Sequence, residues 1–109
     1  MNRMAKLWQK LTPSQRLWVE VFGLYGLPKL DGIRVLAIVD RLPPGEARAI
    51  RLRFGFEGDP LSYEELRKRL LRLDGRQVLS RETARLAVKK AIRHLGQPSW
   101  RKDWEEARI

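Results

Sequence analysis

The segment VLSRETARLAVKKAIRHL, residues 78–95, decides the fold that this chain is expected to adopt. Ser80 is a favourable helix N-cap, and Gly96 stands where glycine commonly ends a helix. Between them, apolar residues follow the spacing of a helix with one buried stripe, at Ala84, Ala87, Val88, Ala91, Ile92 and Leu95. A cationic row recurs at every fourth residue on another side, at Arg81, Arg85, Lys89 and Arg93. The segment therefore predicts a helix whose cationic side faces either solvent or a phosphate backbone.

Charge and composition restrict the class of protein. The chain has 109 residues, a length typical of one domain, and carries 23 Lys and Arg against 13 Asp and Glu, a formal net charge of +10. This surplus favours a polyanionic partner such as nucleic acid, or an acidic protein surface; a basic surface that only aids solubility is the simpler alternative. No cysteine is present, which excludes disulfides and thiolate metal sites, and His94 alone cannot form a metal cluster. We therefore expect no metal and no cofactor.

The sequence also bears on location. No apolar run approaches the roughly 18 residues that a membrane-spanning helix needs. The first residues, MNRMAKLWQKL, lack the apolar core of a secretion signal. Together with the absence of cysteine, these features predict a cytoplasmic protein that does not enter a membrane.

Capping and turn signals divide the rest of the chain into further helices. Thr12 and Gln15 match a capping box, and Ser62 and Glu65 match a second one. Turn residues separate the apolar periodic segments and predict helices at about 4–11, 13–25, 32–42, 44–54, 63–72 and 100–109. No alternating strand pattern of useful length is present, so we expect an all-α helical bundle.

Two of these helices carry large apolar faces. The helix at about 13–25 has an aromatic stripe, expected in the core or alternatively as a docking face for a partner. That stripe comprises Leu17, Trp18, Val21, Phe22 and Tyr25. The helix at about 32–42 is expected to bury Ile33, Val35, Leu36, Ile38, Val39 and Leu42.

The helices at 62–72 and 80–95 suggest a helix-turn-helix, in which the second helix meets base edges in the major groove of DNA. Its N-terminal residues here are Arg81, Glu82 and Arg85. Arginine pairs with guanine through two hydrogen bonds and glutamate accepts one from cytosine, so these three residues are candidates for reading bases. The candidates for phosphate contacts lie further along the helix, at Lys89, Lys90 and Arg93.

Several short motifs, taken in order, point to one protein family. They are VDRLPP (39–44), IRLRFGF (50–56), SYEE (62–65), SRE (80–82) and KAIRHL (90–95). Together they resemble region four of bacterial primary sigma factors, over about residues 35–109. The resemblance implies a helix-turn-helix domain that docks on the flap of the RNA polymerase β subunit and reads double-stranded promoter DNA. Residues 1–34 lie outside it and are expected to form an N-terminal helical extension.

The resemblance also implies a polymerase-docking surface on the part of the domain that precedes the DNA-reading helix. A set of apolar residues is expected either to form the core beneath that surface or to line its pocket. These residues are Leu36, Val39, Ile50, Leu52, Phe54 and Leu66.

Three features depart from the family's pattern. Residues 71–79 add about seven residues between the two helices. Either the first helix is longer, or the turn carries a loop. Arg67 replaces a small residue and needs an ionic partner or a route to solvent. Leu86 replaces a base-contacting glutamine; it can touch a thymine methyl but cannot make the amide's hydrogen bonds, and we keep it among the DNA-contacting candidates.

These features favour a sigma-like transcription regulator that binds RNA polymerase and contacts promoter DNA through the helix at about 81–95. One alternative is a mimic of region four that binds polymerase and blocks or redirects sigma without reading DNA. Another is a free-standing DNA-binding repressor. An enzyme is not expected, because the chain has neither a glycine-rich phosphate loop nor a nucleophile–histidine arrangement.

Overall fold

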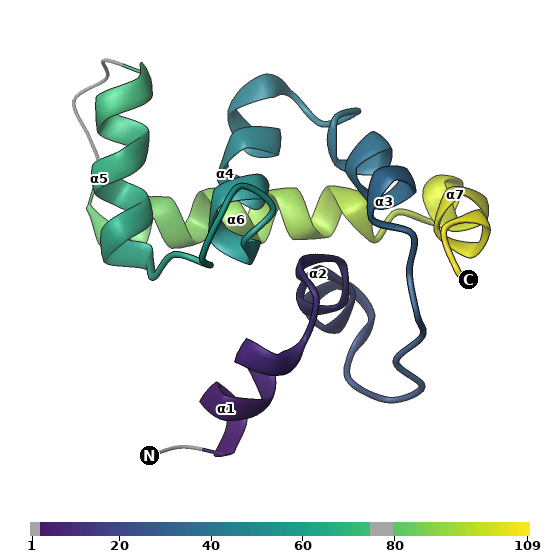
Figure 1. Ribbon diagram of the computed structural model, residues 1–109. Helices are drawn as coiled ribbons and strands as arrows, with labels where there is room; N and C mark the ends of the chain where they lie inside the picture. Colours follow the sequence, from purple (N-terminus) through teal and green to yellow (C-terminus); the bar gives the residue numbers. More distant parts are fainter. Residues whose placement is uncertain (1–2, 75–79) are drawn as a thin grey trace.

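The computed structural model describes the backbone of residues 3–74 and 80–109 and the side chains of residues 6–70 and 80–109. Within that part the chain forms seven α-helices and no β-strand, which confirms the all-α class (Figure 1). The helices are α1 (Arg3–Lys10), α2 (Pro13–Phe22), α3 (Gly32–Val39), α4 (Pro44–Phe54), α5 (Tyr63–Asp74), α6 (Arg81–Leu95) and α7 (Arg101–Glu106). A 3₁₀ turn, η1 (Pro98–Trp100), leads into α7.

Both predicted capping boxes are present. The Thr12 hydroxyl accepts from the Gln15 N–H at 3.1 Å, and the Gln15 side chain accepts from the Thr12 N–H at 3.1 Å. Ser62 and Glu65 make the same reciprocal pair at 3.1 and 3.2 Å. The Ser80 hydroxyl accepts from the Thr83 N–H at 3.0 Å and so begins α6 where the sequence predicts. These bonds satisfy backbone donors that a helix leaves unpaired in its first turn.

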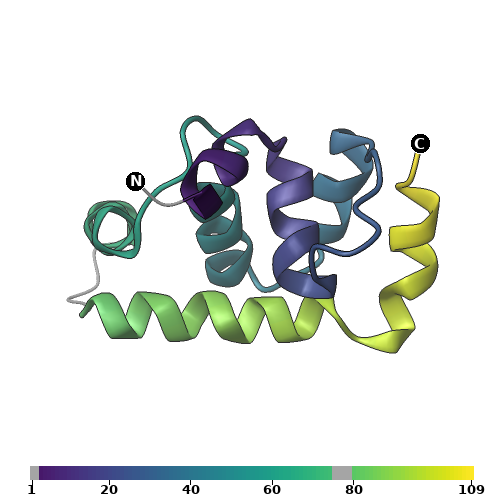
Figure 2. The ribbon, with the colours of Figure 1, turned by 90° about the horizontal axis from the view of Figure 1, so that it is seen from below.

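Helix α6 lies along one edge of the molecule, and the other helices lie on one side of it (Figure 2). Its buried stripe consists of Ala84, Val88, Ala91 and Leu95. Helix α6 makes its main contacts with α4 and α5, and α5 stands across the N-terminal end of α6 (Figure 1). Two of the buried positions are alanines, which permit close approach of the neighbouring helices.

Helix α2 belongs to the same hydrophobic core as the rest of the chain, because Leu17 and Trp18 are buried in it. The Trp18, Phe22 and Trp104 rings pack together, with centroid separations of 4.5 to 5.8 Å. The core assignment of the aromatic stripe is therefore correct for these residues of α2. The predicted boundary between residues 34 and 35 stays a prediction, and the two segments share one core.

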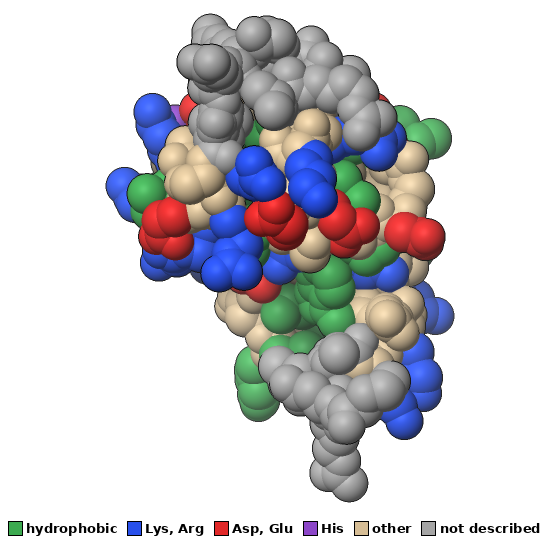
Figure 3. Space-filling model, turned by 90° about the vertical axis from the view of Figure 1, so that its left-hand side faces the viewer, with side chains coloured by type: hydrophobic (Ala, Val, Ile, Leu, Met, Phe, Trp, Pro, Cys, Tyr) green, Lys and Arg blue, Asp and Glu red, His purple; other side chains and the backbone are tan. Residues whose placement is uncertain are grey.

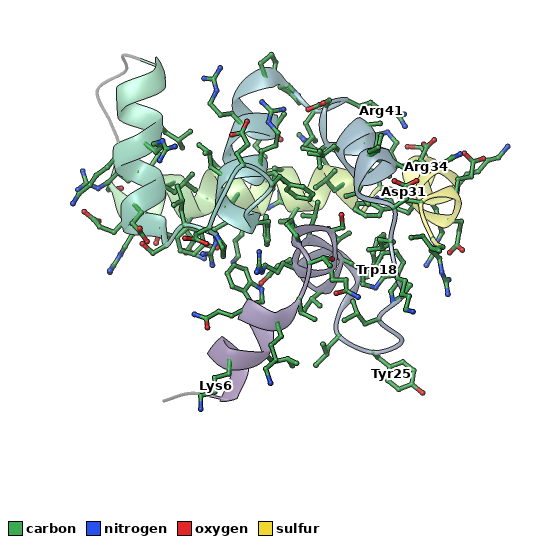
Figure 4. The ribbon with its side chains drawn as sticks, viewed as in Figure 1. Lys6, Trp18, Tyr25, Asp31, Arg34 and Arg41 are labelled. Carbon is green, nitrogen blue, oxygen red and sulfur yellow. The ribbon has the colours of Figure 1, made fainter. Side chains whose placement is uncertain are left out.

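Two apolar residues assigned to the core are in fact exposed. Tyr25 is 99% exposed because α2 ends at Phe22 and the chain turns at Gly23, where φ is 96° (Figure 4). Ile33 is 82% exposed because it precedes the buried Val35 by two residues, and a helix of 3.6 residues per turn points the two side chains in nearly opposite directions.

The ends of two helices differ from the prediction. Helix α5 extends to Asp74, beyond the predicted end at 72, so the longer-helix alternative holds for these two residues; residues 75–79 lie outside the described part. Helix α7 is shorter than the predicted 100–109. The residues after α7 instead form hydrogen bonds with the segment before α3. The Ile109 N–H donates to the Lys29 oxygen at 3.0 Å, and the Asp31 N–H donates to the Ala107 oxygen at 2.8 Å.

Candidate nucleic-acid interface

The side of α6 that points away from the core is exposed along its length. A residue two positions from a buried one points to the opposite side of a helix, as Leu86 does relative to both Ala84 and Val88. No described helix lies beyond this side in Figure 2. We call it the outer face of α6, and its exposed residues are Glu82, Leu86, Lys89, Lys90 and Arg93.

Positive charge dominates the later turns of the outer face. Lys89, Lys90 and Arg93 are exposed, and none of them forms an ion pair with a carboxylate of the described residues. Their long side chains extend into water, where they can reach a phosphate. The predicted phosphate-contacting residues are therefore brought together on one accessible surface.

The predicted base-reading residues are arranged differently. Arg85 donates from Nε to Glu82 Oε2 at 3.0 Å and from Nη2 to Glu82 Oε1 at 2.5 Å. This pairing lowers the pKa of the Glu82 carboxyl and raises that of the Arg85 guanidinium. Arg81 is exposed in the first turn of α6. In the free protein, two of the three candidate readers thus bind one another.

Helix α5 has a mixed charge pattern beside this face. Arg67 donates from Nε to Glu64 Oε2 at 3.3 Å, and a second bond joins its Nη2 to Glu64 Oε1. The predicted need of Arg67 for an ionic partner is therefore met within α5. Figure 3, a view from the α5 side, shows acidic and basic side chains interleaved there. The surplus of positive charge lies further along α6 at Lys89, Lys90 and Arg93.

The residues predicted for polymerase docking are almost all in the core. Five of them are at most 4% exposed: Val39, Ile50, Leu52, Phe54 and Leu66. These five side chains belong to the core, and Leu52 also lines a surface hollow together with Leu61 and Arg69. Leu36 is partly exposed and lines a surface hollow together with Ile33, Leu30 and Phe56.

Sequence reasoning missed a contact between α4 and α6. His94 Nδ1 lies 2.8 Å from Glu46 Oε1, and joins the last turn of α6 to the first turn of α4. In the sequence, His94 stands out only as the single histidine of the chain. Because 48 residues separate the two positions, no local spacing rule could have identified the pair.

Comparisons with known proteins do not assign this site. No protein-family model, curated protein or solved structure matches the chain. Within the described residues, no group of three or more His, Asp or Glu side chains is arranged to hold a metal ion. None of the described helices combines the length and the hydropathy that crossing a bilayer requires.

Proposed function

We propose that this protein is a non-enzymatic, sigma-like transcription regulator that docks on bacterial RNA polymerase and contacts promoter DNA through α6. The observation that carries the DNA half of the proposal is the outer face of α6, which is exposed, continuous and cationic over its later turns. The sequence resemblance to sigma region four over residues 35–109 supports both halves.

The arrangement of α5 and α6 suits a duplex. In helix-turn-helix proteins the second helix enters the major groove while the first crosses the phosphate backbone. Here α5 stands across the N-terminal end of α6 (Figure 1). The exposed Lys89, Lys90 and Arg93 follow in the later turns of α6. Phosphate contacts position a protein on DNA and base contacts specify the sequence. The three cations therefore serve as positioning residues, and the first turns of α6 read the bases.

The docking half of the proposal concerns α3. Its exposed apolar residues, Ile33 and the partly exposed Leu36, border the surface hollow described above. Val39, Ile50 and Phe54 are buried and belong to the core of the domain. Binding of the intact protein to polymerase core enzyme and to an isolated β-flap fragment tests this half. If neither is bound, the docking half is wrong.

Salt-dependent DNA binding tests the other half. The logarithm of the binding constant for a labelled duplex is expected to fall linearly with the logarithm of salt concentration, because binding releases counterions from the DNA. Replacing Lys90 or Arg93 by alanine removes one phosphate contact and should reduce the slope by about 0.9. Lys29→Ala is the matched control, since this exposed lysine lies outside α6. Equal losses in the control and in the α6 variants would argue against an interface on α6.

One observation favours a second candidate, a region-four mimic that binds polymerase without reading DNA. Glu82 and Arg85 are hydrogen-bonded to each other in the free protein. These hydrogen bonds must break before either side chain can contact a base. The double variant Arg81→Ala/Arg85→Ala separates the two functions. A transcriptional effect that survives this change intact would favour the mimic, and its loss would favour DNA contact.

A further inference from the structure

The centre of the outer face of α6 is occupied by an apolar side chain. Leu86 is 51% exposed, and it points almost directly away from the buried Ala84 and Val88. A single exposed leucine is ordinary on a protein surface. The position of Leu86 is less ordinary, because it is the residue of the early turns that projects furthest from the core side of the proposed DNA-reading helix.

Charged residues surround Leu86 along the helix. Glu82 lies one turn before it, and Lys89 and Lys90 lie one turn after it, at the three- and four-residue spacings that make helix side chains neighbours. All three are exposed. If the two lysines contact phosphates, the outer face of α6 is directed toward the major groove of the DNA. Leu86 lies on this face and is therefore directed toward the bases.

Two charged side chains close to Leu86, those of Glu82 and Arg85, are paired with each other. Arg85 uses Nε and Nη2 to bind both carboxylate oxygens of Glu82. In a complex with DNA, the same arginine donors could bind guanine and the same carboxylate could accept a hydrogen bond from cytosine. While Glu82 and Arg85 remain hydrogen-bonded to each other, Leu86 is the side chain of the second turn of α6 that is available to contact a base.

We propose that Leu86 is a specificity-determining residue that reads the C5-methyl group of thymine in the major groove. This inference rests on the proposed DNA-binding function. Among the four ordinary bases only thymine presents a methyl group there. Contact between this methyl and the leucine side chain removes apolar surface of both groups from water.

Removing the methyl group alone provides the test. A preferred duplex is first selected with the wild-type protein from a pool of random sequences. Each thymine in it is then replaced by deoxyuridine, which lacks only the methyl. We expect one replacement to weaken wild-type binding about fourfold, the effect of burying one methylene-sized group. The same replacement should leave the affinity of Leu86→Ala unchanged.

Two further variants keep the result interpretable. Leu24→Ala, which removes a similarly exposed apolar side chain outside α6 (47% exposed), should retain the full sensitivity to deoxyuridine. Leu86→Gln should lose that sensitivity and gain a preference for adenine, since glutamine pairs with adenine through two hydrogen bonds. Circular dichroism verifies that both Leu86 variants keep the wild-type helix content, as expected for an exposed position.

The outcomes separate this inference from the function on which it rests. If wild-type protein binds duplex with a strong salt dependence but tolerates deoxyuridine at every position, or selects no preferred sequence, Leu86 does not read a methyl group and the proposed function still stands. If the protein binds no duplex at any salt concentration tested, both this inference and the DNA-binding half of the proposed function are overturned.

Discussion

The guanidinium of Arg16 donates a hydrogen bond from Nη1 to the main-chain oxygen of Phe54, at 3.1 Å. The same group bonds through Nε to the Trp8 oxygen at 2.9 Å and through Nη2 to the Gln9 oxygen at 3.2 Å. One buried cation of α2 thus satisfies carbonyl groups near the C-terminal ends of both α1 and α4. Cations are favoured at these ends by the helix dipole. Burial lowers the pKa of this guanidinium, and the charge of Asp59 acts in the opposite direction.

Replacing Arg16 by lysine should destabilise the protein by about 1–3 kcal/mol, because lysine keeps the charge but lacks the planar fork that reaches three carbonyl groups. The free energy of unfolding in urea measures the effect. Arg101→Lys is the control at an exposed position and should change stability by less than about 0.5 kcal/mol. A value for Arg16→Lys as small as that of the control would show that the three bonds contribute little.

Gly55→Ala should also destabilise the protein, by about 1–3 kcal/mol. Gly55 ends α4 at φ 88°, and an added Cβ would lie 2.7 Å from Arg16 Nη1. Gly45→Ala is the matched control within the same helix. It has open space around the new Cβ and should stabilise the protein by about 0.4–1 kcal/mol. Thermal unfolding of both variants measures the contrast, and a shift in the same direction for both would contradict it.

Glu82→Gln should increase the affinity for a duplex of arbitrary sequence about three- to tenfold at low salt. The change removes a negative charge from the outer face of α6 and frees Arg85 for phosphate contact. Glu20→Gln, at an exposed position on α2, makes the same charge change elsewhere and is expected to have a smaller effect. Fluorescence anisotropy at several salt concentrations measures both. Weaker binding by Glu82→Gln would instead indicate that this carboxylate contacts DNA directly.

Lowering the pH should reduce the free energy of unfolding, in part because Glu65 becomes protonated. Hydrogen bonds from Ser62 lower the pKa of this carboxyl below its ordinary value of 4.5. Its charged form is therefore favoured by folding; the stabilisation is present above pH 4.5 and disappears as pH falls through the lower folded-state pKa. Glu65→Gln retains a capping-box acceptor without the titration. Its unfolding free energy should fall less steeply than that of the wild type from about pH 5 to about pH 3. Equal slopes would exclude this contribution.

Local signals predicted much of the secondary structure. The Thr12 and Ser62 boxes and the Ser80 cap act within three residues, so the sequence alone reveals them. Periodicity also separated the buried Ala84 stripe from the exposed side of α6. It did not predict that Ile33 is exposed, because an apolar residue in an apolar helix carries no signal of the direction in which it points.

The sequence by itself determined the helices, their caps and the cationic side of α6, because each depends on residues that are neighbours along the chain. Only the tertiary structure decided that Phe54 is enclosed in the core, that Ile33 is exposed and that Arg16 bridges two helix ends. It alone decided that His94 meets Glu46. These outcomes depend on how helices distant in the chain approach and orient, and the pattern within any one helix does not contain that information.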